Sequence, residues 1–293
     1  MFIFTGLKKE SERLMSESIA KSTKTLYKKF WAQFKSFCER LGLSLREKNL
    51  METLELWVAA LSRQGVNYGS ILTRLAAVRH QLKKSEKNVK LSSNRLELML
   101  KGIKKKRKPV IGKTPVTLSH VRRMHRASES LERPRALMFK AMTALAFFGF
   151  LRPSEMCIGR SKHYLLRGDI QISRNSKYCR VNFRTFKHSD SAQSIRIEKL
   201  TQGPVRPIEI IKTYLNSMGF SSRQQPLFDT TVTEFRETLD ELCQAAGIKS
   251  RITPHCFRVG GATWASKQGW SDARIQLHGR WKSGAYKSYI KPY

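Results

Sequence analysis

Residues 253–258, Thr253-Pro254-His255-Cys256-Phe257-Arg258, are the most informative stretch of this sequence. Threonine favours the position before a helix and proline favours the first helical position, so the stretch predicts the start of a helix. His255 and Arg258 are then three residues apart on one face of the first turn. Unpaired N–H groups and the positive end of the helix dipole lie at the same end. We therefore expect an anion site there, with an imidazole and a guanidinium that suit a phosphate.

A second arginine has a similar placement. An apolar run over residues 135–150 predicts a helix that is buried on most sides, and it is followed by Leu151-Arg152-Pro153-Ser154-Glu155. The proline disfavours helical geometry at Arg152, which should stand at the mouth of the next turn. A guanidinium beside so apolar a helix needs an anionic partner. Glu155 can be that partner, and Arg152 would still have donors to spare.

The end of the sequence adds a tryptophan and several tyrosines. It reads Gly279-Arg280-Trp281-Lys282-Ser283-Gly284-Ala285-Tyr286-Lys287-Ser288-Tyr289-Ile290. Ser271 is the expected cap of a short helix that stops at Gly279. The indole of Trp281 offers one N–H donor.

Between these stretches the pattern predicts a small sheet. Residues 181–186 and 194–198 both alternate apolar and polar side chains, so we expect a hairpin across the loop Lys187 to Gln193. Residues 169–172 form a further short strand. Helices resume after Pro207, and Thr231-Val232-Thr233-Glu234 is a capping box. Residues 116–293 therefore read as a mainly helical domain with one small antiparallel sheet.

Residues 1–108 predict a small helical bundle. Apolar stripes at helical spacing occur in four places, near residues 26–38, 54–61, 72–82 and 95–103. In the third of these the stripe is Leu72, Leu75, Val78 and Leu82. Six of the eight residues 101–108 are basic, and Pro109 follows. This run is expected to be a linker, which is solvated, serves nuclear import, or lies along a phosphate backbone.

The net charge of the whole chain limits the classes of partner that it is expected to bind. The 293 residues include 56 Lys and Arg against 22 Asp and Glu, a net charge of +34. An excess this large points to double-stranded DNA or another polyanion and away from a small-molecule substrate. The longest nearly apolar run, Ala141 to Leu151, is too short to cross a membrane, so we expect neither a membrane-bound nor an exported form. Five scattered cysteines indicate buried, reduced thiols and no metal site.

Taken in order, these residues resemble the motifs of the tyrosine recombinase (phage integrase) family. The matches are Gly-Phe-Leu-Arg-Pro-Ser-Glu-Met, Thr-Pro-His-Cys-Phe-Arg, Gly-Arg-Trp-Lys-Ser and a late Tyr-Ile, and they extend over essentially the whole chain. The Gly-Arg-Trp-Lys-Ser form is most similar to the DIRS-like and Crypton-like recombinases of eukaryotic mobile elements. The resemblance implies a helical, SAM-like core-binding domain, residues 1–108, and a catalytic domain, residues 116–293.

The resemblance also implies a role for each matching residue. Tyr289 matches the nucleophile, which forms a 3′-phosphotyrosyl bond with the scissile phosphate. Arg152 and Arg258 match the clamp on the non-bridging oxygens, Lys187 the general acid, and His255 a proton-transfer residue. Trp281 matches the last hydrogen-bond donor and Glu155 the brace of the site. Neither a metal nor another cofactor is implied. The DNA-contacting residues expected in the N-terminal domain are Lys24, Arg74, Arg79, Lys104, Lys105, Lys106 and Arg107.

Several alternatives remain open at this stage. Trp281 and Tyr289 are eight positions apart, one fewer than in the better-known bacterial members, so Tyr286 and Tyr293 are also candidate nucleophiles. His278 is a second candidate for the donor role of Trp281. Few residues follow Tyr289, so either the chain is truncated or protomers use another contact to assemble into the synaptic tetramer that the resemblance implies.

Two other functions compete with recombination. A type IB topoisomerase uses the same residue types as a monomer, and a domesticated recombinase would only bind DNA. The separate helical domain and the basic linker favour a recombinase that serves a mobile element. We expect the protein to be intracellular, and nuclear if the element is eukaryotic.

Overall fold

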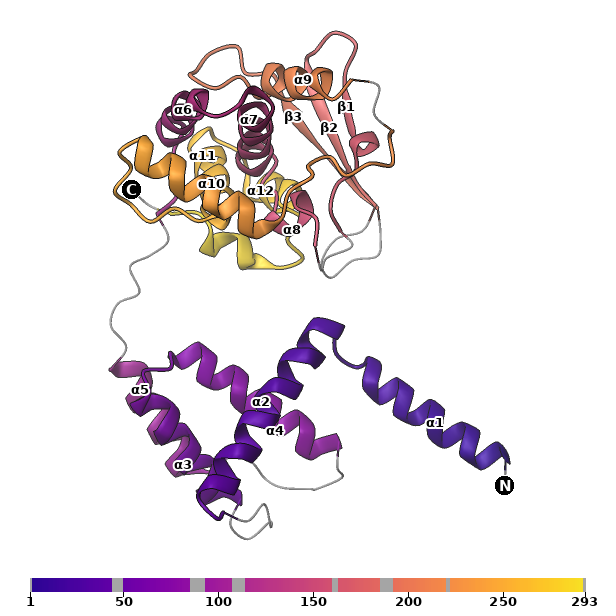
Figure 1. The fold of residues 1–293 in the computed structure, drawn as a ribbon, viewed down its shortest axis with the longest axis vertical. Helices are drawn as coiled ribbons and strands as arrows, with labels where there is room; N and C mark the ends of the chain where they lie inside the picture. Colours follow the sequence, from indigo (N-terminus) through magenta and orange to yellow (C-terminus); the bar gives the residue numbers. More distant parts are fainter. Residues whose placement is uncertain are drawn as a thin grey trace. The chain divides into compact units, whose positions relative to one another are not determined.

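In the computed structural model of this chain, the described residues are 2–43, 50–84, 93–106, 114–159, 163–184, 192–219 and 222–291. They form two compact units, Met1–Ile111 and Gly112–Tyr293 (Figure 1). The chain is mainly helical with one small antiparallel sheet, so the predicted fold class is confirmed. Within the described ranges, no helix combines the length and the apolar character that crossing a membrane requires.

The first unit is a bundle of helices. The four predicted helices are α2 (Lys21–Arg40), α3 (Leu50–Arg63), α4 (Tyr68–Lys84) and α5 (Asn94–Lys105), and each extends beyond its apolar stripe. An additional helix, α1 (Phe2–Glu17), was not predicted. The core of the bundle contains aromatic and aliphatic side chains from α2, α3 and α4, among them Phe34, Phe37, Leu54, Trp57, Ile71, Leu75 and Val78.

Two leucines of the predicted stripes lie outside this core. Leu72 is 39% exposed, whereas the neighbouring Ile71 is fully buried. The buried stripe of α4 therefore runs through Ile71, one residue earlier than predicted, because residues 71, 75, 78 and 82 fall on one face at intervals of three and four. Leu26 is also exposed, since the buried face of α2 begins one turn later, at Phe30.

The second unit surrounds the apolar helix α7 (Arg133–Phe148), which is buried along most of its length as predicted. Helix α7 packs against α9 and α11. The other elements are α6 (Leu118–Ala127), η2 (Ser128–Ser130), α8 (Pro153–Met156), η3 (Arg167–Asp169), α9 (Pro207–Ser217), α10 (Val232–Ala245), α11 (Pro254–Lys267), α12 (Asp272–His278) and η4 (Gly284–Ser288). The predicted capping box at Thr231 and Glu234 is present.

The sheet contains β1 (Ile170–Ile172), β2 (Tyr178–Phe183) and β3 (Gln193–Glu198), in the order β1-β2-β3. Both pairs are antiparallel, and Val181 lies opposite Ile170 on one side and Ile195 on the other. The buried residues alternate along β2 and β3, which confirms the predicted hairpin. Strand β2 begins three residues earlier than the alternation suggested.

Two glycines allow α11 to lie very close to its neighbours. A Cβ atom at Gly260 would be 2.0 Å from the carbonyl oxygen of Val116, and one at Gly261 would be 2.0 Å from that of Phe147. No larger residue fits at either position, which explains a pair of glycines inside a helix. This close packing brings the first turn of α11 to the C-terminal end of α7, where the candidate site lies.

Candidate active site

Helix α11 begins where the sequence predicted. Thr253 has extended geometry and Pro254 occupies the first turn, and both the backbone nitrogen and the hydroxyl of Thr253 lie 3.3 Å from the Sγ atom of Cys256. His255 is half-buried and Arg258 is fully buried. The two side chains therefore start from the same helical turn but differ in their exposure to solvent.

Arg258 is held by the main chain. Its guanidinium donates to the carbonyl oxygens of Phe150 and Gly279, and its Cζ atom lies 4.1 Å from the centre of the Trp281 ring. Its Nε atom has no hydrogen-bond partner within the described part of the chain. Burial, together with the positive charges of Arg152 and Arg280, lowers the pKa of Arg258. An anion beside this guanidinium would stabilise its charged form against both the burial and the neighbouring positive charges.

Arg152 and Glu155 form the expected pair. Arg152 is extended, as a residue before proline should be, and its Nη1 atom donates to Oε1 of Glu155 over 2.8 Å. The backbone nitrogen of Arg152 donates to the other oxygen, Oε2, also over 2.8 Å. The Arg152 side chain remains 21% exposed, so the guanidinium can still meet a ligand.

A third arginine, Arg280, was not predicted to take part. Its side chain is completely buried, and its Nη2 atom donates to Oε2 of Glu155 over 2.7 Å. Burial alone would raise the pKa of Glu155, but Arg280 and Arg152 outweigh it and lower that pKa. Arg280 stands inside the Gly-Arg-Trp motif, yet nothing in one sequence marks it as the partner of a glutamate 125 positions away.

Tyr289 and Trp281 complete the cluster. The centre of the half-buried Tyr289 ring lies 5.3 Å from that of His255 and 5.0 Å from that of Trp281. The Cζ atom of Arg258 is 5.7 Å from the centre of the Tyr289 ring. The hydroxyl of Thr263, on α11, donates to the carbonyl oxygen of Tyr289 over 3.1 Å and so holds this residue against α11.

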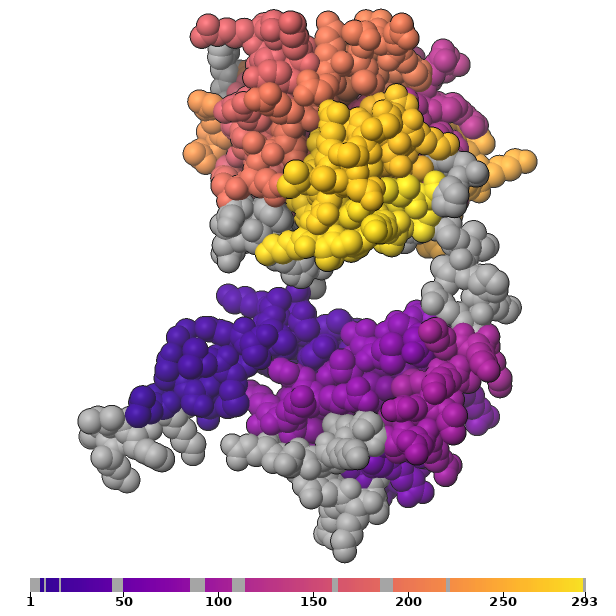
Figure 2. Space-filling view, turned by 180° about the vertical axis from the view of Figure 1, so that it is seen from behind, coloured from indigo at the N-terminus to yellow at the C-terminus, as the bar shows by residue number. Residues whose placement is uncertain are grey.

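Gly279 allows Trp281 to take its position. A Cβ atom at Gly279 would lie 1.6 Å from the Trp281 ring, so a side chain there would displace the indole. Trp281 and Tyr286 pack into a small apolar cluster with Phe150 and Ile275. Seen from behind, the C-terminal part of the chain, which includes α12 and the segment that follows it, forms one continuous gold-to-yellow surface (Figure 2).

The two alternative side chains have other partners. Tyr286 is buried, and its hydroxyl donates to Oδ2 of Asp272 over 2.9 Å, a hydrogen bond that raises the pKa of Tyr286. His278 is also buried, with its Nε2 atom 2.8 Å from the carbonyl oxygen of Phe148. Burial lowers the pKa of His278 to about 4, so the ring is neutral at pH 7 and its single N–H is used by that carbonyl. Tyr293 lies outside the described residues.

The remaining predicted residues lie elsewhere or are not described. Lys187 and Arg107 fall outside the described residues. Lys104, Lys105 and Lys106 are exposed at the end of α5. In the bundle, Arg79 is exposed, while Lys24 and Arg74 are half-buried.

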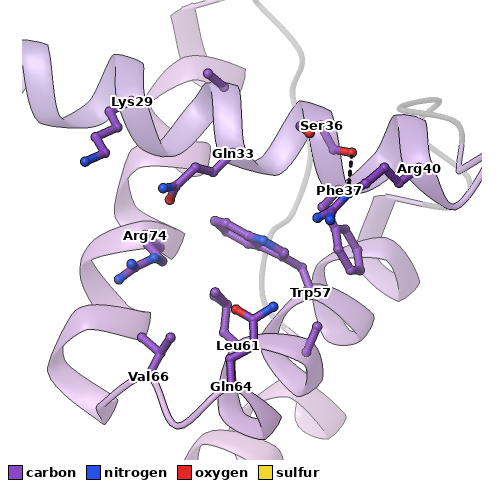
Figure 3. A pocket seen from close by; sticks show the side chains of 12 residues that line it. Lys29, Gln33, Ser36, Phe37, Arg40, Trp57, Leu61, Gln64, Val66 and Arg74 are labelled. Carbon is purple, nitrogen blue, oxygen red and sulfur yellow. Dashed lines mark hydrogen bonds between the residues drawn. The ribbon is translucent and has the colours of Figure 1, made fainter.

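A basic cavity of the first unit was not foreseen. It measures about 570 Å³ between α2, α3 and α4, and the Trp57 ring lies in its middle, with Arg74 and Gln33 at its side (Figure 3). Lys29, Arg40 and Arg74 are the charged residues of its lining, so it attracts anions. The Cζ atom of Arg74 also lies 4.5 Å from the centre of the Phe30 ring.

The five cysteines are buried, as expected, and their thiols are free. Over the part of the chain that the structure describes, no three His, Cys, Asp or Glu side chains gather so that they could hold a metal ion.

Solved structures with a similar fold come from DNA recombination. The Tn1549 transposon integrase in complex with transposon right-end DNA is 12% identical, with a TM-score of 0.67 over 97% of this chain and 93% of that one. A lambda integrase dimer bound to a COC′ core site is 16% identical, with a TM-score of 0.64 over 98% and 77%. XerH recombinase bound to a palindromic difH substrate is 11% identical, with a TM-score of 0.56 over 84% and 69%. No protein-family model and no curated protein matches the sequence.

Proposed function

We propose that this chain, whose fold is that of the tyrosine recombinases, is a site-specific DNA recombinase that cleaves and rejoins DNA through a phosphotyrosyl intermediate. One observation carries the proposal. Two guanidinium groups, of Arg152 and Arg280, form ion pairs with the single carboxylate of Glu155, and a third, that of Arg258, lies within the electrostatic influence of all three groups and against a half-buried tyrosine. Three positive charges against one negative leave the cluster in need of an anion, and a phosphodiester is the anion of a strongly basic DNA-binding chain.

The proposed reaction is an in-line displacement at phosphorus. The phenolate of Tyr289 forms the new O–P bond, and the bond from phosphorus to the 5′-oxygen breaks with its electron pair. That oxygen takes up a proton, for which we assign Lys187 by resemblance. Arg152 and Arg258 stabilise the charge that develops on the non-bridging oxygens. The second half-reaction reverses these bonds with a new 5′-hydroxyl.

The phenol must lose its proton to attack. We assign that proton to the imidazole of His255, whose ring centre lies 5.3 Å from that of Tyr289. The Cζ atom of Arg258 lies 5.7 Å from the centre of the Tyr289 ring and adds positive charge beside it. Tyr286, in contrast, donates to a carboxylate, which opposes ionisation of its phenol. We therefore assign the attack to Tyr289.

Arg258 has to exchange partners during this reaction. It is fully buried under Trp281, and both of its terminal nitrogens are bound to carbonyl oxygens. We propose that DNA binding shifts the segment of Trp281 to Tyr289 and exposes Arg258 to the phosphate. The indole N–H of Trp281 would then serve as the last donor, because the N–H of His278 is already bound.

The first unit has a supporting part in this proposal. Residues 1–108 would clamp DNA, with Lys24, Arg74, Arg79, Lys104, Lys105, Lys106 and Arg107 near the phosphates, and residues 116–293 would carry the reaction. Assembly into a synaptic tetramer, service to a mobile element and nuclear residence belong to the same proposal.

The test is a covalent adduct on nicked DNA. A duplex with a nick near the cleavage position loses its leaving strand, so an enzyme that uses a tyrosine stays attached to the DNA. Because the target sequence is not encoded in a readable motif, the substrate is a pool of duplexes, and the adduct selects the cleaved one. The wild-type chain should form the adduct in EDTA and without ATP, and mass spectrometry should map it to Tyr289.

Two single-atom variants provide the controls. Tyr289→Phe should lose all adduct while it retains DNA binding, and Tyr286→Phe should retain the adduct. An adduct that persists in Tyr289→Phe but disappears in Tyr286→Phe would reassign the nucleophile. Salt-sensitive DNA binding without any adduct in the wild type would reject the reaction and favour a domesticated binding protein, whereas relaxation of supercoiled DNA by monomers without site preference would favour the topoisomerase.

A further inference from the structure

We propose that Arg280 is a positioning residue of the reaction. It binds one oxygen of Glu155 and fixes the orientation of that carboxylate, so that Arg152 keeps hydrogen-bond donors for the scissile phosphate. This inference rests on the proposed function. It concerns a residue whose side chain is completely buried and forms an ion pair with Glu155.

The first support is the way the two oxygens of Glu155 are divided. Oε2 accepts from Nη2 of Arg280 over 2.7 Å and from the backbone nitrogen of Arg152 over 2.8 Å. Oε1 accepts from Nη1 of Arg152 over 2.8 Å. Without Arg280 the carboxylate could rotate and bind the Arg152 guanidinium with both oxygens, which is the preferred geometry of an arginine–carboxylate pair. Donors intended for the phosphate would then be used by the glutamate.

The second support is the end of helix α7. Three successive carbonyl oxygens there lack partners within the helix, and each faces a side chain from the C-terminal part of the chain. His278 lies against that of Phe148, Arg280 against that of Gly149 at 3.5 Å, and Arg258 against that of Phe150. Arg280 also donates to the carbonyl oxygen of His278 over 3.3 Å.

These contacts connect the two halves of the site. Arg152 follows α7 by four residues, and Trp281 follows Arg280 directly. Arg280 therefore joins the segment that carries Arg152 to the segment that carries Trp281 and Tyr289.

The third support is that stability alone gives little reason for this arrangement. Arg280 has a left-handed backbone with φ of +56°, and its Nε atom has no hydrogen-bond partner in the described ranges. Both features are unfavourable, against the favourable cation–π contact of its Cζ atom, 3.9 Å from the centre of the Phe183 ring. Apolar replacement of buried ion pairs is often neutral for stability. The cost is understandable if Arg280 prepares Arg152 for an anion.

The experiment compares two substrates. On the duplex that the adduct experiment selects, one non-bridging oxygen of the scissile phosphate is replaced by a methyl group. The resulting methylphosphonate has no negative charge, so its cleavage depends little on a correctly presented Arg152. Adduct formation is measured under single-turnover conditions with saturating DNA, for the wild type, Arg280→Met and Arg280→Lys. Leu239→Ala, in the buried core at α10, is the control for a general loss of stability.

We expect Arg280→Met to slow the reaction of the phosphodiester at least tenfold and that of the methylphosphonate less than threefold, with DNA affinity unchanged within twofold. Arg280→Lys keeps one charge near Glu155 and should recover part of the rate; it carries the test if Arg280→Met does not fold. Leu239→Ala should alter both substrates equally. Equal slowing of both substrates by the Arg280 variants, or no slowing of either, would overturn the inference. A wild-type chain without any adduct would instead reject the proposed function.

Discussion

At the candidate site, Glu155 binds both Arg152 and Arg280, whereas Arg258 donates to main-chain carbonyl oxygens. Arg152 and Glu155 could be paired from the sequence, because they are three residues apart around a proline. Arg280 could not, because its partner is distant in sequence and only the fold brings the two together. The burial of Arg258 was equally invisible, since a motif gives the spacing of a side chain and not its depth.

The burial of His278 predicts how the free energy of unfolding depends on pH. Burial lowers the pKa of His278 from 6.5 to about 4 and that of His125 from 6.5 to about 3. Below pH 6.5 the unfolded chain binds protons that the folded chain refuses, so the free energy of unfolding falls as the pH falls. One histidine contributes about 1.4 kcal/mol per pH unit in this window.

Replacing His278 by Gln should therefore remove part of that slope. Urea unfolding of the wild type and of His278→Gln at about pH 7 and about pH 5 measures it. The variant should lose about 2 kcal/mol less than the wild type between the two conditions, since one titrating group is missing. His125→Gln is the matched variant, because His125 is also neutral and buried, next to Thr143, away from the α7 end. The same slope in all three proteins would contradict this account.

At the scale of elements, local pattern was a good guide wherever a face is buried. The hairpin of β2 and β3, the apolar helix α7 and the starts of α10, α11 and α12 all carry alternation, an apolar run or a cap. The first residue of the predicted stripe in α4 was wrong, because Ile71 and Leu72 are both apolar and only packing selects one of them, whereas Leu75, Val78 and Leu82 are buried as predicted. Helix α1 was missed, since its exposed Leu7 and Leu14 do not mark a core face.

The contact of α11 with α7 gives a second prediction. Alanine is favoured over glycine inside a helix by about 1 kcal/mol, so Gly261→Ala would stabilise α11 if space were available. The added methyl group would instead meet the carbonyl oxygen of Phe147. We expect Gly261→Ala to lower the stability of the second unit by about 1–3 kcal/mol, as overpacking does.

Gly102→Ala, within α5, is the matched control. A Cβ atom there would meet nothing within 4 Å, so the same substitution should stabilise the first unit by about 0.5–1 kcal/mol. Calorimetry of both variants, with the transition of each unit followed separately, tests the pair. If Gly261→Ala also raised the melting temperature, α11 would not lie as close to α7 as described.

At the scale of the whole molecule, the order of the motifs predicted the fold class, because four short patterns in a fixed order constrain a chain more than any one of them. The target sequence and the assembly on DNA could not be predicted in the same way. Base recognition depends on which side chains reach the groove edges, and no pattern in a single chain encodes that. Net charge, in contrast, is a property that the sequence states directly and that governs binding to any duplex.

The exposed lysines at the end of α5 permit a quantitative test of that charge. If Lys104, Lys105 and Lys106 each neutralise one phosphate, replacing all three by Ala removes three contacts, and each contact contributes about 0.9 to the slope of log affinity against log salt. The triple variant should therefore bind every duplex more weakly, by a similar factor, with a slope smaller in magnitude by about 2.7.

A second triple variant, with Ala at Lys199, Lys212 and Lys249, removes the same charge from exposed positions of the second unit and should leave the slope within about one contact of the wild type. Equal effects of the two variants would mean that the overall charge of the chain, and not phosphate contacts by these three lysines, holds the DNA. A loss confined to one target sequence would mean that these lysines contact bases, because phosphate contacts weaken all sequences alike.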